Sequence, residues 1–260
     1  MSDALLELTD LSIKFGGLKA VDGLTMSVPE GALYGLIGPN GAGKTTVFNM
    51  LTGVYTPTRG SINFPGQSLL GLKPHEISKL GLARTFQNIR LFKRLSVLDN
   101  TMIPAYQHSQ TNMLDVILQT ERFQKEDKEL KDKAIAILNL FGLDSSKHDL
   151  ASSLPYGSQR KLEIVRALMS RPRMILLDEP AAGMNHAETD ILMKLIDQVR
   201  TSFGVAILLI EHDMKLVMGI CEKIFVLDYG LKIAEGPASA VRNSPKVIEA
   251  YLGVDQELSP

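Results

Sequence analysis

A glycine-rich segment between an apolar run and a helix-forming run is the feature that most restricts the fold of this sequence. Residues 38–45 read Gly-Pro-Asn-Gly-Ala-Gly-Lys-Thr and match the pattern G-x-x-x-x-G-K-[ST]. The apolar run Leu33–Ile37 before the segment is typical of a buried strand, and Lys44–Leu51 after it is typical of a helix. This order predicts the first unit of an α/β core that binds a phosphate group.

The residue types in this loop suit nucleotide phosphates. Glycines let backbone N–H groups approach phosphate oxygens, and the N-terminus of the following helix adds partial positive charge. Lys44 is placed to reach the β- and γ-phosphates, and the hydroxyl of Thr45 is placed to bind Mg²⁺. An ordinary glycine-rich turn is the alternative, and the flanking strand and helix argue against it.

A second apolar run, Met174–Leu177, ends in two carboxylates, Asp178 and Glu179. Parallel α/β sheets bind ligands at the carboxyl ends of their strands, so these side chains are expected beside the phosphate loop. Asp178 is the natural carboxylate for Mg²⁺, and Glu179 is the natural base or orienter of an attacking water.

Composition excludes several classes of protein. The 260 residues carry 28 basic and 29 acidic side chains, so bulk charge does not favour nucleic acid. No apolar run reaches the roughly 18 residues that span a bilayer, and Met1-Ser2-Asp3-Ala4 does not begin a signal peptide. A single cysteine, Cys221, forms no internal disulfide and suggests a reducing, cytosolic compartment. A chain docked on a membrane protein remains compatible with these features.

The remaining pattern predicts one discontinuous α/β domain. Two strands near the N-terminus, Leu5–Phe15 and Thr25–Val28, suggest an antiparallel β part. The signal from Ser96 to about Leu150 is helical, and the densely charged 121–133 reads as a solvated helix face rather than a binding surface. Beyond Gly157, helices and strands alternate: helices at Ser158–Ser170, Ala187–Thr201 and from Ser244-Pro245, and strands at Met174–Leu177, Ala206–Ile210, Ile224–Leu227 and Leu231–Ala234.

Six elements stand in the order found in ATP-binding cassette (ABC) ATPases, and the chain resembles that family over nearly its whole length. They are Phe15, the loop from Gly38 to Thr46, Gln87 in Arg84-Thr85-Phe86-Gln87, Leu154-Pro155-Tyr156-Gly157-Ser158, Asp178-Glu179-Pro180, and His212 in Ile210-Glu211-His212-Asp213. The resemblance implies a P-loop NTPase core with an N-terminal antiparallel β subdomain and an inserted α-helical subdomain. The RecA-like core with the β subdomain is expected at 1–87 and 155–260, and the insertion at 88–154.

The resemblance also implies a role for each element, with ATP and Mg²⁺ as cofactors. Phe15 would stack on adenine; ordinary core is the less favoured alternative for a phenylalanine on a strand. Glu179, His212 and Gln87 would be catalytic. Thr45, Gln87 and Asp178 would bind the metal. ATP would be held by Gly38, Pro39, Asn40, Gly41, Ala42, Gly43, Lys44, Thr45 and Thr46.

The segment Leu154–Ser158 stands where ABC ATPases carry their signature sequence, and it departs from the family pattern. Tyr156, Gly157 and Ser158 would face the γ-phosphate bound to a partner subunit, but the usual sequence there is Leu-Ser-Gly-Gly-Gln. Pro155 replaces the serine, and proline offers neither a hydroxyl nor an N–H. One alternative is therefore an ATP-binding coupling subunit that supports little hydrolysis.

A finer resemblance is to the LivG-type ATPases of branched-chain amino-acid importers. It is carried by 15–21, 83–92, 162–164, 178–183 and 248–253. It implies a second ABC ATPase subunit (LivF-like, or a second copy), two membrane permease subunits and, indirectly, a solute-binding protein as partners. The expected location is the cytoplasmic face of the membrane, with Asn88 to Pro104 docking on a permease loop.

Two alternatives to this reading remain. Another solute, such as urea or other amino acids, is one, because the ATPase never touches the solute. A soluble ABC protein of translation or DNA repair is the other. The single cassette without a long coiled coil argues against that class.

Overall fold

The computed structural model describes residues 4–256, apart from the side chains of residues 215 and 252–256. The chain forms two compact units. Residues up to Arg84 and residues from Arg173 onward make the first, and Thr85–Pro172 make the second. The first unit is therefore discontinuous in sequence, and the expected insertion 88–154 lies inside the second unit.

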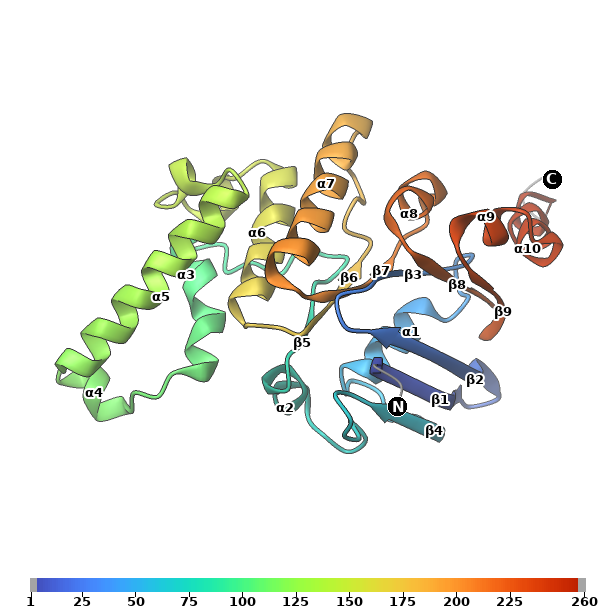
Figure 1. Ribbon diagram of the computed structural model, residues 1–260, viewed down its shortest axis with the longest axis horizontal. Coiled ribbons are helices and arrows are strands. Elements are labelled where there is room, and N and C mark those ends of the chain that lie inside the picture. Colours follow the sequence, from blue (N-terminus) through green and yellow to red (C-terminus); the bar gives the residue numbers. More distant parts are fainter. Residues whose placement is uncertain (1–3, 257–260) are drawn as a thin grey trace. The chain divides into compact units, whose positions relative to one another are not determined.

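A six-stranded sheet forms the centre of the first unit (Figure 1). Its strands lie in the order β5 (Leu82–Arg84), β6 (Met174–Asp178), β7 (Ala206–Ile210), β3 (Leu33–Ile37), β8 (Lys223–Asp228) and β9 (Leu231–Gly236). Neighbours are parallel, except that β9 runs antiparallel to β8. Every residue of β6 and β7 is buried, which explains why their sequences are almost continuously apolar.

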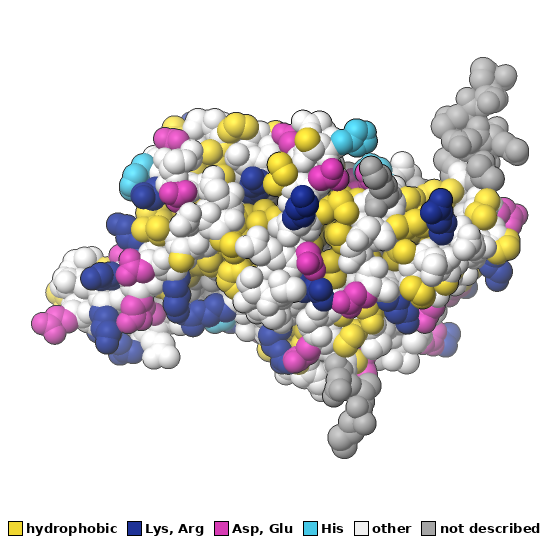
Figure 2. All heavy atoms as spheres, turned by 45° about the horizontal axis from the view of Figure 1, so that its top comes forward, with side chains coloured by type: hydrophobic (Ala, Val, Ile, Leu, Met, Phe, Trp, Pro, Cys, Tyr) yellow, Lys and Arg dark blue, Asp and Glu magenta, His cyan; other side chains and the backbone are white. Residues whose placement is uncertain are grey.

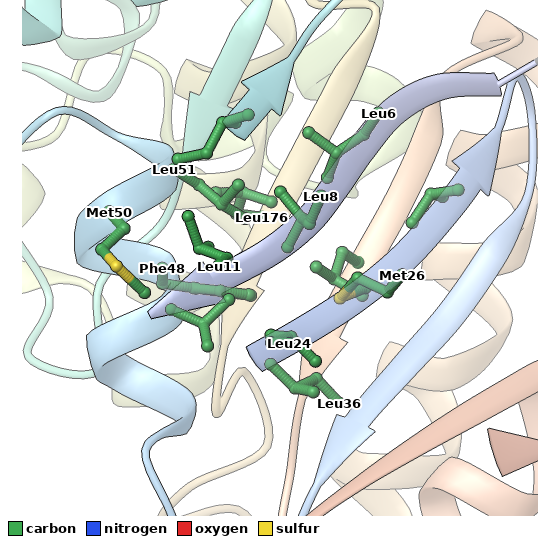
Figure 3. Packing of buried hydrophobic residues seen from close by; sticks show 14 of the residues in the cluster. Leu6, Leu8, Leu11, Leu24, Met26, Leu36, Phe48, Met50, Leu51 and Leu176 are labelled. Carbon is green, nitrogen blue, oxygen red and sulfur yellow. The ribbon is translucent and has the colours of Figure 1, made fainter. Parts of the chain in front are cut away.

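A smaller antiparallel sheet packs against this core. Its strands lie in the order β2 (Leu18–Pro29), β1 (Ala4–Phe15) and β4 (Arg59–Asn63). One buried cluster joins the two sheets (Figure 3). It contains Leu8 and Leu11 of β1, Phe48 of the helix Lys44–Leu51, and Leu36 and Leu176 of the large sheet. The two sheets of the first unit thus share a hydrophobic core.

The helices of the first unit follow local rules of sequence. They are α1 (Lys44–Leu51), α2 (Pro74–Lys79), α7 (His186–Phe203), α8 (Met214–Ile220), α9 (Ala238–Arg242) and α10 (Pro245–Gln256). In α7, Asn185 and Glu188 form a capping box, and Gly204 ends the helix with a φ of 63°. Within residues 4–256, no helix is long and apolar enough to cross a membrane.

The elements described in the second unit are all helical. They are α3 (Val97–Met102), η1 (Ile103–His108), α4 (Met113–Ile117), α5 (Glu121–Leu140), η2 (Asp144–Ser146), η3 (Ala151–Ser153) and α6 (Tyr156–Met169). In α5 only Leu130, Ala134 and Leu138 are buried. Most of the charged residues at its N-terminal end are therefore exposed to solvent.

The predicted α/β architecture is confirmed, and the differences concern short elements. The strand predicted at Thr25–Val28 is the last part of the longer β2. The strand β4 was not predicted. β4 contains a glycine and only one buried residue, Ile62, so its composition does not indicate a strand.

The close approach of the phosphate loop to β8 leads to a stability prediction. A Cβ at Gly38 would collide with the carbonyl oxygen of Leu227, whereas a Cβ at Gly41 would meet nothing within 4 Å. Both glycines have positive φ. We expect Gly41→Ala to cost about 1–2 kcal/mol from backbone strain alone, and Gly38→Ala to cost clearly more. Urea unfolding of both variants measures the difference, and equal losses would contradict the predicted collision.

Candidate functional site

The phosphate loop joins the end of β3 to the first turn of α1. Gly43 stands at the N-cap of α1 with a φ of 104°, and a Cβ there would lie 2.5 Å from the carbonyl oxygen of Ala20. Gly230 donates its N–H to the carbonyl of Ala42 at 3.0 Å, which ties the loop to the β8–β9 turn. The predicted residues of the loop and first turn lie together as expected: Gly38, Pro39, Asn40, Gly41, Ala42, Gly43, Lys44, Thr45 and Thr46.

The ammonium group of Lys44 lies inside the loop. Its Nζ donates to the carbonyl oxygens of Gly38 at 2.7 Å and Pro39 at 2.8 Å, and the residue is only 7% exposed. Burial lowers the pKa of Lys44, while Glu179 and Asp178 act in the opposite direction. A buried cation held by carbonyl dipoles is suited to bind phosphate oxygens.

Asp178 ends β6 and is buried in an ion pair with Arg84. The guanidinium Nη2 of Arg84 donates to Asp178 Oδ2 at 2.8 Å, and Nη1 donates to Asn49 Oδ1 of α1 at 2.7 Å. Arg84 ends the neighbouring strand β5. Its side chain therefore orients the carboxylate of Asp178 and links it to the helix that follows the phosphate loop.

The oxygen donors of the first unit fit a magnesium ion. The hydroxyl-bearing Thr45 is exposed at the start of α1, and Asp178 supplies a carboxylate. The described residues contain no group of three or more His, Cys, Asp or Glu side chains that could hold a metal. Mg²⁺ commonly takes one or two protein oxygens and completes its shell with phosphates and water, so this donor set suits it.

Glu179 and His212 face each other across neighbouring strands. Glu179 follows β6 with a φ of 47°, and its N–H donates to the carbonyl of Ile210 at 2.9 Å. The Nδ1 atom of His212 lies 3.9 Å from Glu179 Oε2, and the His212 side chain is 61% exposed. The two side chains therefore lie close together where β6 and β7 end.

Glu211 is a buried carboxyl that the sequence analysis did not single out. Its Oε1 accepts the N–H of Ala181 at 2.9 Å, and its Oε2 accepts the N–H of His212 at 3.3 Å. Burial raises the pKa of this carboxyl, and only 1% of the residue is exposed. Glu211 thus joins the turn after Glu179 to the segment that carries His212.

Phe15 lies at the end of β1 with 45% of the residue exposed, so it is not a core residue. Its ring contacts Tyr55 edge to face, with centroids 5.1 Å apart and planes at 70°. Tyr55 was not predicted. The exposed ring of Phe15 is free to stack on a flat apolar group.

A cavity of about 650 Å³ borders the phosphate loop. It is lined by Pro39, Asn40, Gly41, Ala42, Asp228, Tyr229, Ile233, Lys246, Glu249 and Ala250. The last three belong to α10. The C-terminal helix therefore borders the loop, which the sequence analysis did not foresee.

The other predicted site residues lie in the second unit. Gln87 is exposed in the segment after β5, and Tyr156, Gly157 and Ser158 form the first turn of α6. Pro155 is the N-cap of α6 and provides no side-chain cap. The first turn of this helix thus presents backbone N–H groups without the usual hydroxyl.

Comparison with known proteins agrees with this arrangement. The family model for ABC transporters matches residues 21–182, and a model for branched-chain amino acid ATP-binding cassette transporters matches residues 232–257. The chain belongs to the ATP-binding cassette family of ABC transporters. It is an ATPase of this family, and its ligand is a nucleotide.

Two relatives are similar over almost their whole length. The high-affinity branched-chain amino acid transport ATP-binding protein BraF of Pseudomonas aeruginosa is 46% identical over 97% of this chain and 99% of its own. LivG of Escherichia coli K12, with the same description, is 45% identical over the same shares. Among solved structures, MJ1267 in its ADP conformation, an ATP-binding cassette of an ABC transporter, has a TM-score of 0.83 at 30% identity, covering 97% of this chain and all of its own.

The raised pKa of Glu211 leads to a prediction about stability and pH. Below the pKa that the Glu211 carboxyl has in the unfolded chain, the carboxyl is protonated in both states and the native state keeps its full stability. This contribution to stability is lost as pH rises through the higher pKa of the folded state. We therefore expect Glu211→Gln, which cannot ionise, to gain stability relative to the parent protein as pH rises above the usual glutamate pKa of about 4.3. Urea unfolding on both sides of this pKa measures the trend. The exposed Glu129→Gln serves as the control, and a parallel trend in both variants would contradict the prediction.

Proposed function

We propose that this ATPase is the nucleotide-binding subunit of an importer for branched-chain amino acids. The observation that carries the proposal is the identity of 45–46% with BraF and LivG over nearly the whole of each chain. Because the ATPase does not contact the solute, the solute comes from these relatives and not from a pocket in this chain.

The proposed reaction is hydrolysis of the γ-phosphate of ATP with Mg²⁺. Lys44 and the N–H groups of the phosphate loop bind the phosphates. When bound, Mg²⁺ would neutralise negative charge on the β- and γ-phosphates. The residues that would hold it are Thr45, Asp178 and Gln87. The ion pair between Arg84 and Asp178 keeps the carboxylate in one orientation.

Glu179 is the proposed general base that takes a proton from the attacking water. Its backbone is fixed by the bond to Ile210, and its Oε2 lies 3.9 Å from His212 Nδ1. This closeness supports the proposed contact of His212 with the γ-phosphate. Phe15 is proposed to stack on adenine.

The proposed partners are a second ABC ATPase subunit, two membrane permeases and, through them, a solute-binding protein. Tyr156, Gly157 and Ser158 would complete the nucleotide site of the second subunit. The segment from Asn88 to Pro104 would dock on a permease at the cytoplasmic face of the membrane, and its exposed Phe92 supports this role. Basic and acidic side chains are interspersed on the face drawn in Figure 2, which gives no support to a nucleic acid partner.

Lys44→Ala tests the phosphate loop. Removal of the buried ammonium leaves phosphate oxygens without a charged donor, so we expect ATP affinity to fall at least roughly tenfold. Equilibrium binding of a fluorescent ATP analogue, with competition by ATP, measures the change. Lys128→Ala, on the exposed face of α5, is the matched control, and equal affinities of the two variants would overturn the assignment of the loop.

Glu179→Gln tests the general base. The amide keeps the shape of the side chain but cannot accept the proton, so ATP binding should persist while turnover falls about 10²–10⁴-fold. Steady-state phosphate release and ATP binding are measured on the same preparation, with the ATPase in its transporter complex. If turnover remains within a factor of two of the parent protein, Glu179 is not the base.

A further inference from the structure

Two buried charged side chains of α6 hold the backbone of the segment that carries Gln87. Arg160 is 2% exposed, and its Nη1 donates to the carbonyl oxygen of Phe86 at 2.6 Å. Its Nη2 donates to the carbonyl oxygen of Gln87. Glu163 is 6% exposed, and its Oε1 accepts the N–H of Phe86 at 3.2 Å. One pair of side chains therefore binds both the N–H and the carbonyl of Phe86, and the carbonyl of Gln87.

The two side chains also bind each other. Arg160 Nη1 lies 3.2 Å from Glu163 Oε2, one turn further along α6. Burial raises the pKa of Glu163, while the N–H groups of Phe86 and Arg90 and the charge of Arg160 oppose this shift. A buried ion pair gives little net stability compared with apolar side chains of similar size, so stability alone does not explain this pair.

The pair connects to the first turn of α6 through Tyr156. Arg160 Nη2 donates to the Tyr156 hydroxyl at 3.2 Å, and the guanidinium carbon lies 5.6 Å from the centre of the tyrosine ring. Tyr156, Arg160 and Glu163 are spaced four and three residues apart, so they lie on one face of the helix. Tyr156 occupies the position of the first glycine in the usual signature, and a glycine could not form this contact.

The same face of α6 continues along the segment beyond Gln87. Arg166 donates to the carbonyl oxygen of Arg90, and its guanidinium carbon lies 5.0 Å from the centre of the Phe92 ring. The guanidinium carbon of Arg90 lies 4.1 Å from the centre of the Phe86 ring. The backbone around Gln87 therefore follows α6 at several points.

We propose that Arg160 and Glu163 are positioning residues that fix Gln87 for its bond to magnesium, and that Tyr156 links this position to the first turn of α6. The inference rests on the proposed function, which assigns Gln87 to the metal and the first turn of α6 to the nucleotide of a partner subunit. A shift of that turn moves Arg160 through Tyr156, and Arg160 moves the carbonyl groups of Phe86 and Gln87. The two nucleotide sites of a dimer are then connected inside one subunit.

The test separates binding of ATP from binding of Mg²⁺. The full chain in its transporter complex is assayed for ATP affinity in EDTA and for ATPase rate as a function of free Mg²⁺. In Arg160→Met/Glu163→Met both charges are replaced together, which avoids an unpaired buried charge. We expect its metal-free ATP affinity to stay within twofold of the parent value, while the Mg²⁺ concentration for half-maximal rate rises roughly tenfold.

Tyr156→Phe removes only the hydroxyl and keeps the ring, so it decides the question if the double variant does not fold. We expect a rise of roughly three- to tenfold in the half-maximal Mg²⁺ concentration, because one hydrogen bond to a charged group is lost. Lys161→Met, a neighbour on α6 outside these contacts, is the matched control and should leave the Mg²⁺ dependence unchanged.

Gln87→Ala distinguishes failure of this inference from failure of the proposed function. If Gln87→Ala shifts the Mg²⁺ dependence while Tyr156→Phe and the double variant do not, the positioning role of Arg160 and Glu163 is overturned. If Gln87→Ala itself has no effect, the assignment of Gln87 to the metal is wrong and the inference falls with it. A change in thermal stability alone, with unchanged Mg²⁺ dependence, shows that the pair only packs α6.

Discussion

The parallel pairing of β6 with β7 and of β7 with β3 determines where the chemical groups of the first unit lie. Asp178 is in register with Ile210, and Ile210 is in register with Leu36. The phosphate loop, the carboxylates after β6 and the Glu211-His212 pair therefore leave the sheet at the same edge. Since backbone hydrogen bonds fix this register, a shift of one strand by a residue would turn its side chains to the opposite face.

The parts of this arrangement that depend on local sequence patterns were predictable. Buried parallel strands are apolar throughout, and a phosphate loop has a fixed pattern of residues, so β3, β6, β7 and α1 follow from the sequence. The proximity of Glu179 and His212 agrees with their places after the neighbouring strands β6 and β7. The tight backbone of the phosphate loop was predictable because its glycines are the residues that readily adopt positive φ values.

The partners of the predicted residues were not predictable. Arg84 binds Asp178, and Glu211 binds the N–H of Ala181, through contacts between segments far apart in sequence. No periodic pattern encodes such pairs, because they depend on how strands and loops come together in three dimensions. The contacts of Arg160 with Phe86 and Gln87 are of the same kind, since the sequence identified both segments but not the bonds between them.

The discontinuity of the first unit has a consequence for the order in which the protein folds. The carbonyl of Gly81 accepts N–H groups of Arg173 and Met174, and β5 pairs with β6, so the sheet joins residues on either side of the second unit. During synthesis, β5 has no partner until the whole of the second unit and β6 have been made. The second unit is one continuous segment whose contacts close shorter loops, which favours early folding. Its folding also shortens the effective distance between Arg84 and Arg173, and so reduces the entropy lost when the central sheet is completed.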